Sequence, residues 1–221
     1  NRIDGARTLR ELNVHGERYD YYSLAAAEEL GLAGVSRLPY TLKVVLENVL
    51  RQHAEGSAPA QDIEAVAAWL DKDGTEREIG FKPTRVLMVD SSGIPLLGDM
   101  AAMRDAMVRL GGDARRINPA VPVDFIIDHS VMVDHAGSAD ALQRNMRLEI
   151  ERNRERFAFL RWGARAFDNL RLIPPGAGIC HQINLEHIAR VVWTREADGR
   201  ALAYPDSLLG MDSHTPMIGS L

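Results

Sequence analysis

The chain has 221 residues, 46% of them hydrophobic and 26% charged, an ordinary balance that supports one large domain or slightly more. Its formal net charge of −5 argues against a dedicated nucleic-acid or anionic-membrane surface. Cys180 is the only cysteine, which excludes an intrachain disulfide, a cysteine-rich zinc site and a self-contained iron–sulfur site. We find no apolar run of membrane-spanning length and no signal-peptide core, and we expect a cytoplasmic setting.

Four segments in the first third of the chain can be assigned from local patterns. Residues 1–20 mix charges and glycine without a clear period, and we expect an extended arm. Residues 23–30 predict a short helix that begins with a capping serine and stops at a glycine. Hydrophobic residues recur at helical spacing over 40–53 and predict an amphipathic helix. A further helix is expected over 62–70.

Strands and helices alternate in the rest of the chain. The apolar run 85–89 predicts a buried strand that leads into a loop at Asp90. We then expect a helix over 99–110, a strand over 121–127 and a long helix over 139–167 whose charged face is solvated.

A hairpin with an Asp-Gly turn is expected over 191–204. Strands that alternate with helices predict the α/β fold class, with a layered sheet and flanking helices. No internal repeat or low-complexity segment is visible.

Three histidines stand where an apolar stretch gives way to polar residues: His129, His181 and His214. Each segment can end a strand and present an imidazole in a loop, and open α/β sheets bind ligands at the carboxyl ends of their strands. Asp128 directly precedes His129, and Asp212 lies two residues before His214. Such His–Asp pairs can donate or accept a proton near neutral pH.

The same histidine segments can also be ordinary surface turns and helix caps, and spacing alone leaves both interpretations open. No G-x-S-x-G motif surrounds Ser213, which argues against a serine hydrolase. The glycine- and proline-rich loop before His181 lacks the lysine of a P-loop, so it is a weak candidate for a phosphate site.

A series of blocks along the chain carries a family resemblance. The blocks are 85–88, 99–106, 118–124, 127–131, 159–163, 166–169, 181–186 and 212–216. In this order they resemble the aconitase family, in its bacterial aconitase A and iron-regulatory-protein branch. The resemblance extends from about Ser36 to the end, and it implies an arm and short helix over 1–35 and most of the first α/β domain over 36–221.

The resemblance implies a hydro-lyase of the tricarboxylic acid cycle that interconverts citrate and isocitrate through cis-aconitate on a 4Fe–4S cluster. Asp128 and His129 then match the pair that assists departure and return of the substrate hydroxyl, and His181 matches a further active-site histidine. Asp212, Ser213 and His214 match a segment at the substrate and the open iron.

Several parts of the family's site lie elsewhere in its four-domain members. The cluster cysteines, the substrate-binding arginines and the serine base are in later domains, so this chain is expected to hold no metal and to be inactive alone. The remaining domains would be supplied in the same protein or as a second subunit.

Within the blocks, Val89 stands where the family usually has a glutamine that contacts substrate, while the following Asp90 is retained as a candidate substrate-binding residue. Met211 and Gly219 are further departures. The loss of the amide leaves open a related dehydratase for 2-methylcitrate or another tricarboxylate. A non-catalytic aconitase-like module that binds RNA is a further alternative.

Overall fold

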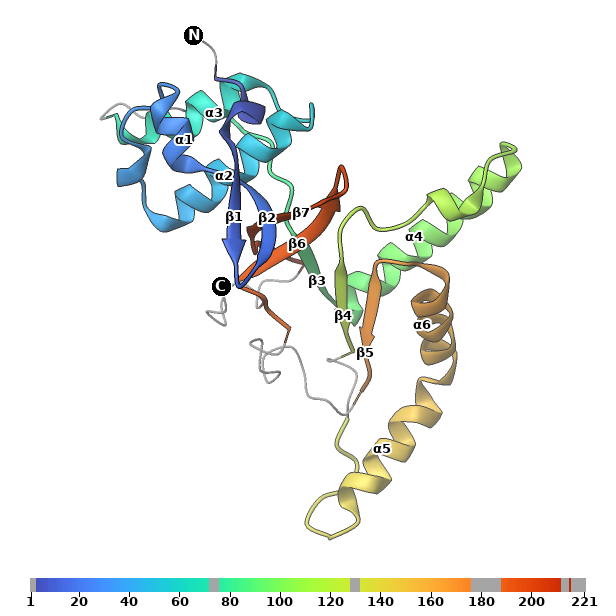
Figure 1. Cartoon of the computed structure of the whole chain (residues 1–221). Helices are drawn as coiled ribbons and strands as arrows, with labels where there is room; N and C mark the ends of the chain where they lie inside the picture. Colours follow the sequence, from blue (N-terminus) through green and yellow to red (C-terminus); the bar gives the residue numbers. More distant parts are fainter. Residues whose placement is uncertain (1–2, 72–75, 128–131, 176–187, 212–214, 216–221) are drawn as a thin grey trace. The chain divides into compact units, whose positions relative to one another are not determined.

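The structure, a computed structural model, describes residues 3–71, 76–127, 132–175, 188–211 and 215 (Figure 1). Packing divides the chain into two compact units. The first comprises Asn1–Pro83 and Arg190–Ser207, and the second comprises Thr84–Ala189 and Leu208–Leu221. The domain boundary expected between residues 35 and 36 stays a prediction.

The first unit contains a four-stranded sheet in the order β1-β2-β7-β6. Its strands are β1 (Leu9–Val14), β2 (Glu17–Tyr22), β6 (Val192–Ala197) and β7 (Arg200–Pro205). β1 with β2 and β6 with β7 form antiparallel hairpins, and β2 and β7 join the hairpins in parallel. The predicted Asp-Gly hairpin is confirmed, because Asp198 and Gly199 form its turn with φ of 52° and 76°.

The extended arm expected over residues 1–20 is wrong, because β1 and β2 form a hairpin. His15 and Gly16 make its turn with φ of 52° and 90°, and the Asn13 side chain accepts a hydrogen bond from the Gly16 N–H at 3.0 Å. β1 is exposed along its whole length, so the strand lacks the hydrophobic alternation that identifies a half-buried strand.

Three short helices and three 3-10 turns pack together in the first unit. The helices are α1 (Leu24–Glu29), α2 (Tyr40–Ala54) and α3 (Ala60–Ala67), and the 3-10 turns are η1 (Gly5–Thr8), η2 (Val35–Arg37) and η3 (Ala68–Leu70). The Ser23 hydroxyl caps α1 by accepting from the Ala26 N–H, as the sequence predicts. Leu46, Leu50 and Ile63 are fully buried in the core between these helices, which confirms the amphipathic helix after Pro39.

The second unit is built on a parallel sheet in the order β5-β4-β3-β8. Its strands are β3 (Arg85–Val89), β4 (Val123–Ile126), β5 (Leu170–Ile173) and β8 (Leu208–Gly210). The strands expected over 85–89 and 121–127 are confirmed, and so is the α/β class with helices beside the sheet. Side chains alternate between its faces, so that Val86 and Met88 join one hydrophobic cluster while Leu87 and Val89 join another.

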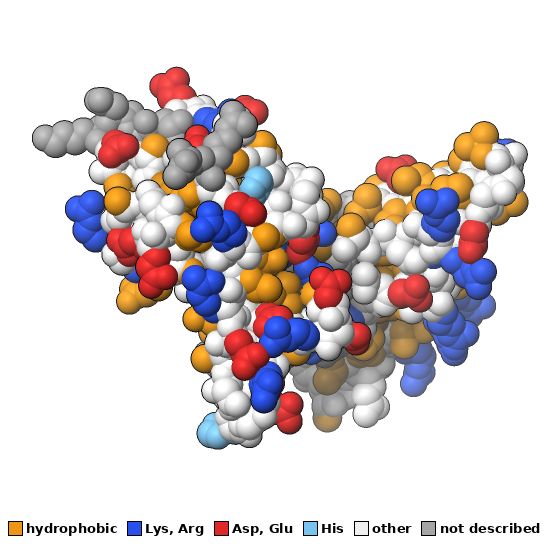
Figure 2. Space-filling view, turned by 45° about the horizontal axis from the view of Figure 1, so that its top comes forward, with side chains coloured by type: hydrophobic (Ala, Val, Ile, Leu, Met, Phe, Trp, Pro, Cys, Tyr) orange, Lys and Arg blue, Asp and Glu red, His pale blue; other side chains and the backbone are white. Residues whose placement is uncertain are grey.

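The described residues of the second unit form three helices, α4 (Asp90–Arg109), α5 (Ala141–Arg152) and α6 (Arg154–Ala166), and one 3-10 turn, η4 (Ala114–Arg116). α4 and α6 lie on the same side of the sheet (Figure 1), where Leu97 and Leu160 pack against Phe125 in one cluster. The outer end of α4 carries exposed hydrophobic residues, including Leu110 just after the helix, and hydrophobic side chains gather there in Figure 2.

Two helix boundaries in the second unit differ from the prediction. α4 begins at Asp90, directly after β3, where we expect a loop. Gly93 lets the first turns of α4 approach β4, because a Cβ at this position would lie 2.2 Å from the Phe125 ring. The long helix expected over 139–167 is two helices that meet at Asn153. The Asn153 side-chain amide donates to the carbonyl and the carboxylate of Glu149, and this local bonding ends α5.

Among the described residues, none of the helices is both long and apolar enough to cross a bilayer.

Candidate functional site

The four strands of the second unit are parallel, so their carboxyl ends lie at one edge of the sheet, which we call the carboxyl edge. Val89, Ile126 and Ile173 are the last residues of β3, β4 and β5 and stand in register with one another. β8 pairs with the other side of β3 and ends at Gly210. Open α/β sheets bind their ligands at such an edge.

Every candidate segment from the sequence follows one of these strands. Asp90 comes directly after β3, and residues 128–131 and 212–214 follow β4 and β8 after a single intervening residue. Residues 176–187 follow β5 after two intervening residues, both prolines. The candidates that lie outside the described residues, and whose roles stay predictions, are Asp128, His129, His181, Asp212, Ser213 and His214.

Asp90 is the candidate residue that lies within the described part of the chain. It is 5% exposed and opens α4, where the N-terminal helix dipole favours a negative charge. The Arg156 guanidinium on α6 donates to a carboxylate oxygen of Asp90 at 3.2 Å. Arg156, which we expect on a solvated face, has a side chain that is 36% exposed and also reaches this buried carboxylate. Sequence reasoning missed the pair because its members are 66 positions apart.

Val89, the departure from the family pattern, is 1% exposed at the end of β3. It packs with Leu87, Ile126 and Ile188 on the face of the sheet opposite to α4 and α6. An apolar side chain fits this cluster without needing a hydrogen-bond partner, whereas a buried amide would need one.

The opposite, amino-terminal ends of β4 and β5 are held by a polar network. Asn118 accepts hydrogen bonds from the Asp168 N–H and from the Arg104 guanidinium, both at 3.1 Å. The Asn169 amide donates to the Pro119 carbonyl at 3.1 Å, and the guanidinium of Arg104 lies 4.0 Å from the centre of the Phe167 ring. Three blocks of the family resemblance thus meet here, in a structural role.

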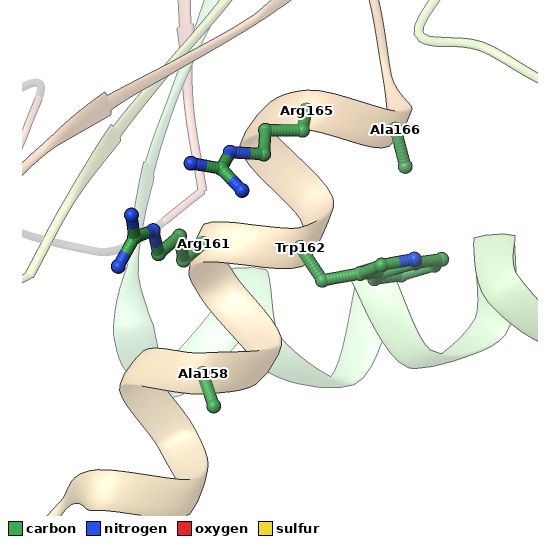
Figure 3. A pocket seen from close by; sticks show the side chains of 5 residues that line it. All are labelled: Ala158, Arg161, Trp162, Arg165 and Ala166. Carbon is green, nitrogen blue, oxygen red and sulfur yellow. The ribbon is translucent and has the colours of Figure 1, made fainter.

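Each unit carries a hollow among its described residues. One, of about 700 Å³, is open and lies on α6; Figure 3 shows Arg161 and Arg165 extending to one side of the helix and Trp162 to the other. The other, of about 310 Å³, lies in the first unit and is lined mainly by tyrosine and aliphatic side chains. Neither is lined by a candidate residue from the sequence.

A buried ion pair lies beside the hollow of the first unit. Glu47 on α2 accepts two hydrogen bonds from Arg51, at 3.0 and 3.4 Å, one helical turn away. The Arg51 guanidinium also lies 4.4 Å from the centre of the Tyr204 ring. Burial raises the pKa of Glu47, and it does so against the opposing effect of Arg51. Because Glu47 and Arg51 pair with each other, this cluster is a structural feature of the unit.

In the part of the chain that the structure describes, three or more histidine, cysteine or acidic side chains never converge as they would around a metal ion. Cys180 lies outside the described residues, and a 4Fe–4S cluster needs several thiolates. The residues of this chain therefore do not fit such a cluster by themselves.

A model of the aconitase family (aconitate hydratase) matches residues 61–221 of the chain. The chain is 53% identical to aconitate hydratase A of Legionella pneumophila over 218 residues, which are 99% of this chain. It is 52% identical to aconitate hydratase A of Pseudomonas aeruginosa over 220 residues, again 99% of the chain, and 50% identical to that of Escherichia coli K12 over 219 residues, or 97%.

The chain spans 24% of the length of each of these relatives. The family match covers the whole second unit and part of the first, and the relatives match nearly the whole chain. Together with the parallel sheet and the blocks that surround both of its edges, these matches show that the chain belongs to the aconitase family.

Proposed function

We propose that the complete protein is a hydro-lyase that interconverts citrate and isocitrate through cis-aconitate, and that this chain forms one wall of its active site. The observation that carries the proposal is the common edge of four parallel strands, each of which is followed by a candidate segment. Membership of the aconitase family supports the reaction.

Dehydration of a β-hydroxy acid needs a base at the carbon next to a carboxylate and an acid at the leaving hydroxyl. In our proposal Asp128 keeps the His129 imidazole oriented and basic enough to handle the proton of that hydroxyl. His181 and the Asp212–His214 pair serve the same side of the substrate, and Ser213 and Asp90 contribute to substrate binding. The base that acts at carbon belongs to another part of the protein.

The 4Fe–4S cluster supplies Lewis-acid chemistry to the complete enzymes of this family. Because this chain has a single cysteine, we propose that the cluster ligands and the carboxylate-binding arginines come from the remaining domains, in the same protein or as a second subunit. We also propose a cytoplasmic location, in keeping with reducing conditions and a lone thiol.

The test compares this chain with the complete protein. Each is reconstituted with iron and sulfide under anaerobic conditions, and formation of cis-aconitate from citrate and from isocitrate is followed by its ultraviolet absorbance. We expect turnover by the complete protein and none by the isolated chain. A complete protein that holds its cluster and turns over neither substrate would refute the proposal.

The burial of Val89 in an apolar cluster favours a second candidate function, that of a dehydratase for 2-methylcitrate. This substrate has one methyl group more than citrate, and an apolar wall suits that group. The ratio of kcat/KM on citrate and on 2-methylcitrate in the complete protein decides between the two substrates. Salt-dependent binding of RNA by a protein without turnover would instead support the non-catalytic alternative.

A further inference from the structure

The ion pair between Arg156 and Asp90 connects α6 to the carboxyl edge. Asp90 follows β3, the strand that lies between β4 and β8 in the sheet. The segments after those two neighbours carry five of the candidate site residues, Asp128, His129, Asp212, Ser213 and His214. Asp90 is a charged residue of the described part of the chain, and in strand order it follows the strand between those that precede the two candidate His–Asp segments.

We propose that Arg156 is a positioning residue for substrate binding, acting through Asp90; this inference rests on the proposed function. The Asp90 side chain is only 6% exposed, so its charge is costly unless a partner compensates it. Arg156 supplies a positively charged partner from a neighbouring helix at 3.2 Å and helps to fix the direction of the carboxylate.

The chemistry of the substrate makes this compensation important. Citrate, isocitrate and cis-aconitate each carry up to three negative carboxylates, and the loss of a cationic partner would make a buried aspartate at the edge repel them more strongly. With Arg156 in place, the pair is neutral and Asp90 can orient polar groups without that repulsion. The Arg156 side chain is 36% exposed, so the guanidinium can be replaced without opening the hydrophobic core.

A second ion pair in the same sheet provides a matched control. Arg171 donates to Asp124 at 2.6 Å, between the second residues of β5 and β4. Asp124 is also largely buried, and its partner is also partly exposed. The two pairs share chemistry and sheet, but the Arg171–Asp124 pair lies in the amino-terminal half of both strands, away from the carboxyl edge.

The experiment measures steady-state kinetics of the complete protein carrying Arg156→Gln, Arg156→Lys or Arg171→Gln. We expect Arg156→Gln to raise the KM for citrate by about ten-fold or more, with a smaller change in kcat, because binding rather than the chemical step is affected. Arg156→Lys keeps the charge and should recover most of the affinity. Arg171→Gln should leave KM within about two-fold of the unchanged protein.

Thermal unfolding of each variant separates these effects from misfolding. Equal KM values for Arg156→Gln and Arg171→Gln in an active protein would overturn the role of Arg156 while leaving the proposed function intact. A fall in kcat alone, with KM unchanged and no recovery by lysine, would also overturn it. A complete unmodified protein that neither binds nor turns over citrate would refute both proposals.

Discussion

The side-chain oxygen of Asn118 accepts a hydrogen bond from the backbone N–H of Asp168 at 3.1 Å, which ties the segments leading into β4 and β5 together. The same oxygen accepts from Arg104 on α4 at 3.1 Å. The network therefore lies at the end of the strands opposite to the candidate site. A parallel sheet whose amino-terminal ends are fixed in this way can vary the loops at its carboxyl edge without losing its register.

Replacing Asn118 should weaken the second unit. Asn118→Ala removes the hydrogen bonds that its side-chain oxygen accepts from the Asp168 N–H and from Arg104, and we expect the free energy of unfolding to fall by about 0.5–1.5 kcal/mol. Urea unfolding followed by circular dichroism measures the change. Gln143→Ala, at an exposed position of α5, is the control and should stay within about 0.5 kcal/mol. Equal midpoints for the two variants would show that the network contributes nothing to stability.

Two glycines of α4 offer a matched pair of substitutions. A Cβ at Gly93 would lie 2.2 Å from the Phe125 ring, whereas a Cβ at Gly98 would have no neighbour within 4 Å. Gly93→Ala should therefore destabilise the chain by about 1–3 kcal/mol through overpacking. Gly98→Ala should stabilise it by about 0.5–1 kcal/mol, because alanine favours the helix. Unfolding midpoints that shift in the same direction for both variants would contradict this account.

The elements that the sequence predicts well are those with a strong local signal. Ser23 caps α1, the apolar run 85–89 forms β3, and the Asp-Gly pair turns the hairpin of β6 and β7. The helix break at Asn153 and the direct start of α4 at Asp90 were not predictable in the same way. The start of α4 depends on packing, since Gly93 must fit against Phe125 and Asp90 must meet Arg156. The break at Asn153 rests on local bonds from its side chain to Glu149, which the charge pattern of the helix did not reveal.

The candidate site could be predicted only as a set of strand ends. Polar residues that follow apolar runs indicated His129, His181 and His214 as strand-end candidates, and the family resemblance added Asp90. The strand order brings the ends of the strands that precede these segments to one edge. No local pattern connects Arg156 to that edge, because a strand and two helices separate it from Asp90 in the chain. Long-range ion pairs of this kind have no local pattern.

The buried Glu47 should make stability depend on pH. Because burial raises its pKa above the ordinary value for glutamate, the folded chain keeps the proton at pH values where the unfolded chain has released it. The stability from this group is complete below the ordinary pKa and is lost as the pH rises through the raised one. Urea unfolding of the chain and of Glu47→Gln between about pH 4 and pH 8 should give a difference in free energy that falls as the pH rises.

Glu64→Gln is the control for this measurement, since it removes an exposed carboxyl from α3 and leaves the Glu47–Arg51 pair in place. A difference between the unmodified chain and Glu47→Gln that grows with pH would mean that attraction to Arg51 outweighs the cost of burial. The opposite sign would thus contradict the raised pKa directly.

Val89 provides a test that combines stability and ligand binding. Val89→Gln places an amide in the cluster of Leu87, Ile126 and Ile188, and without a partner it should cost about 1–3 kcal/mol. If the carboxyl edge binds citrate in the complete protein, the new amide gains a partner when citrate is present, so citrate should raise the Tm of the variant more than that of the unmodified protein.

Leu87→Gln is the control, since Leu87 lies two residues earlier on the same face and is fully buried. It should lower the Tm by the same amount whether citrate is present or absent. Equal citrate-induced shifts for both variants would place position 89 outside the reach of the substrate.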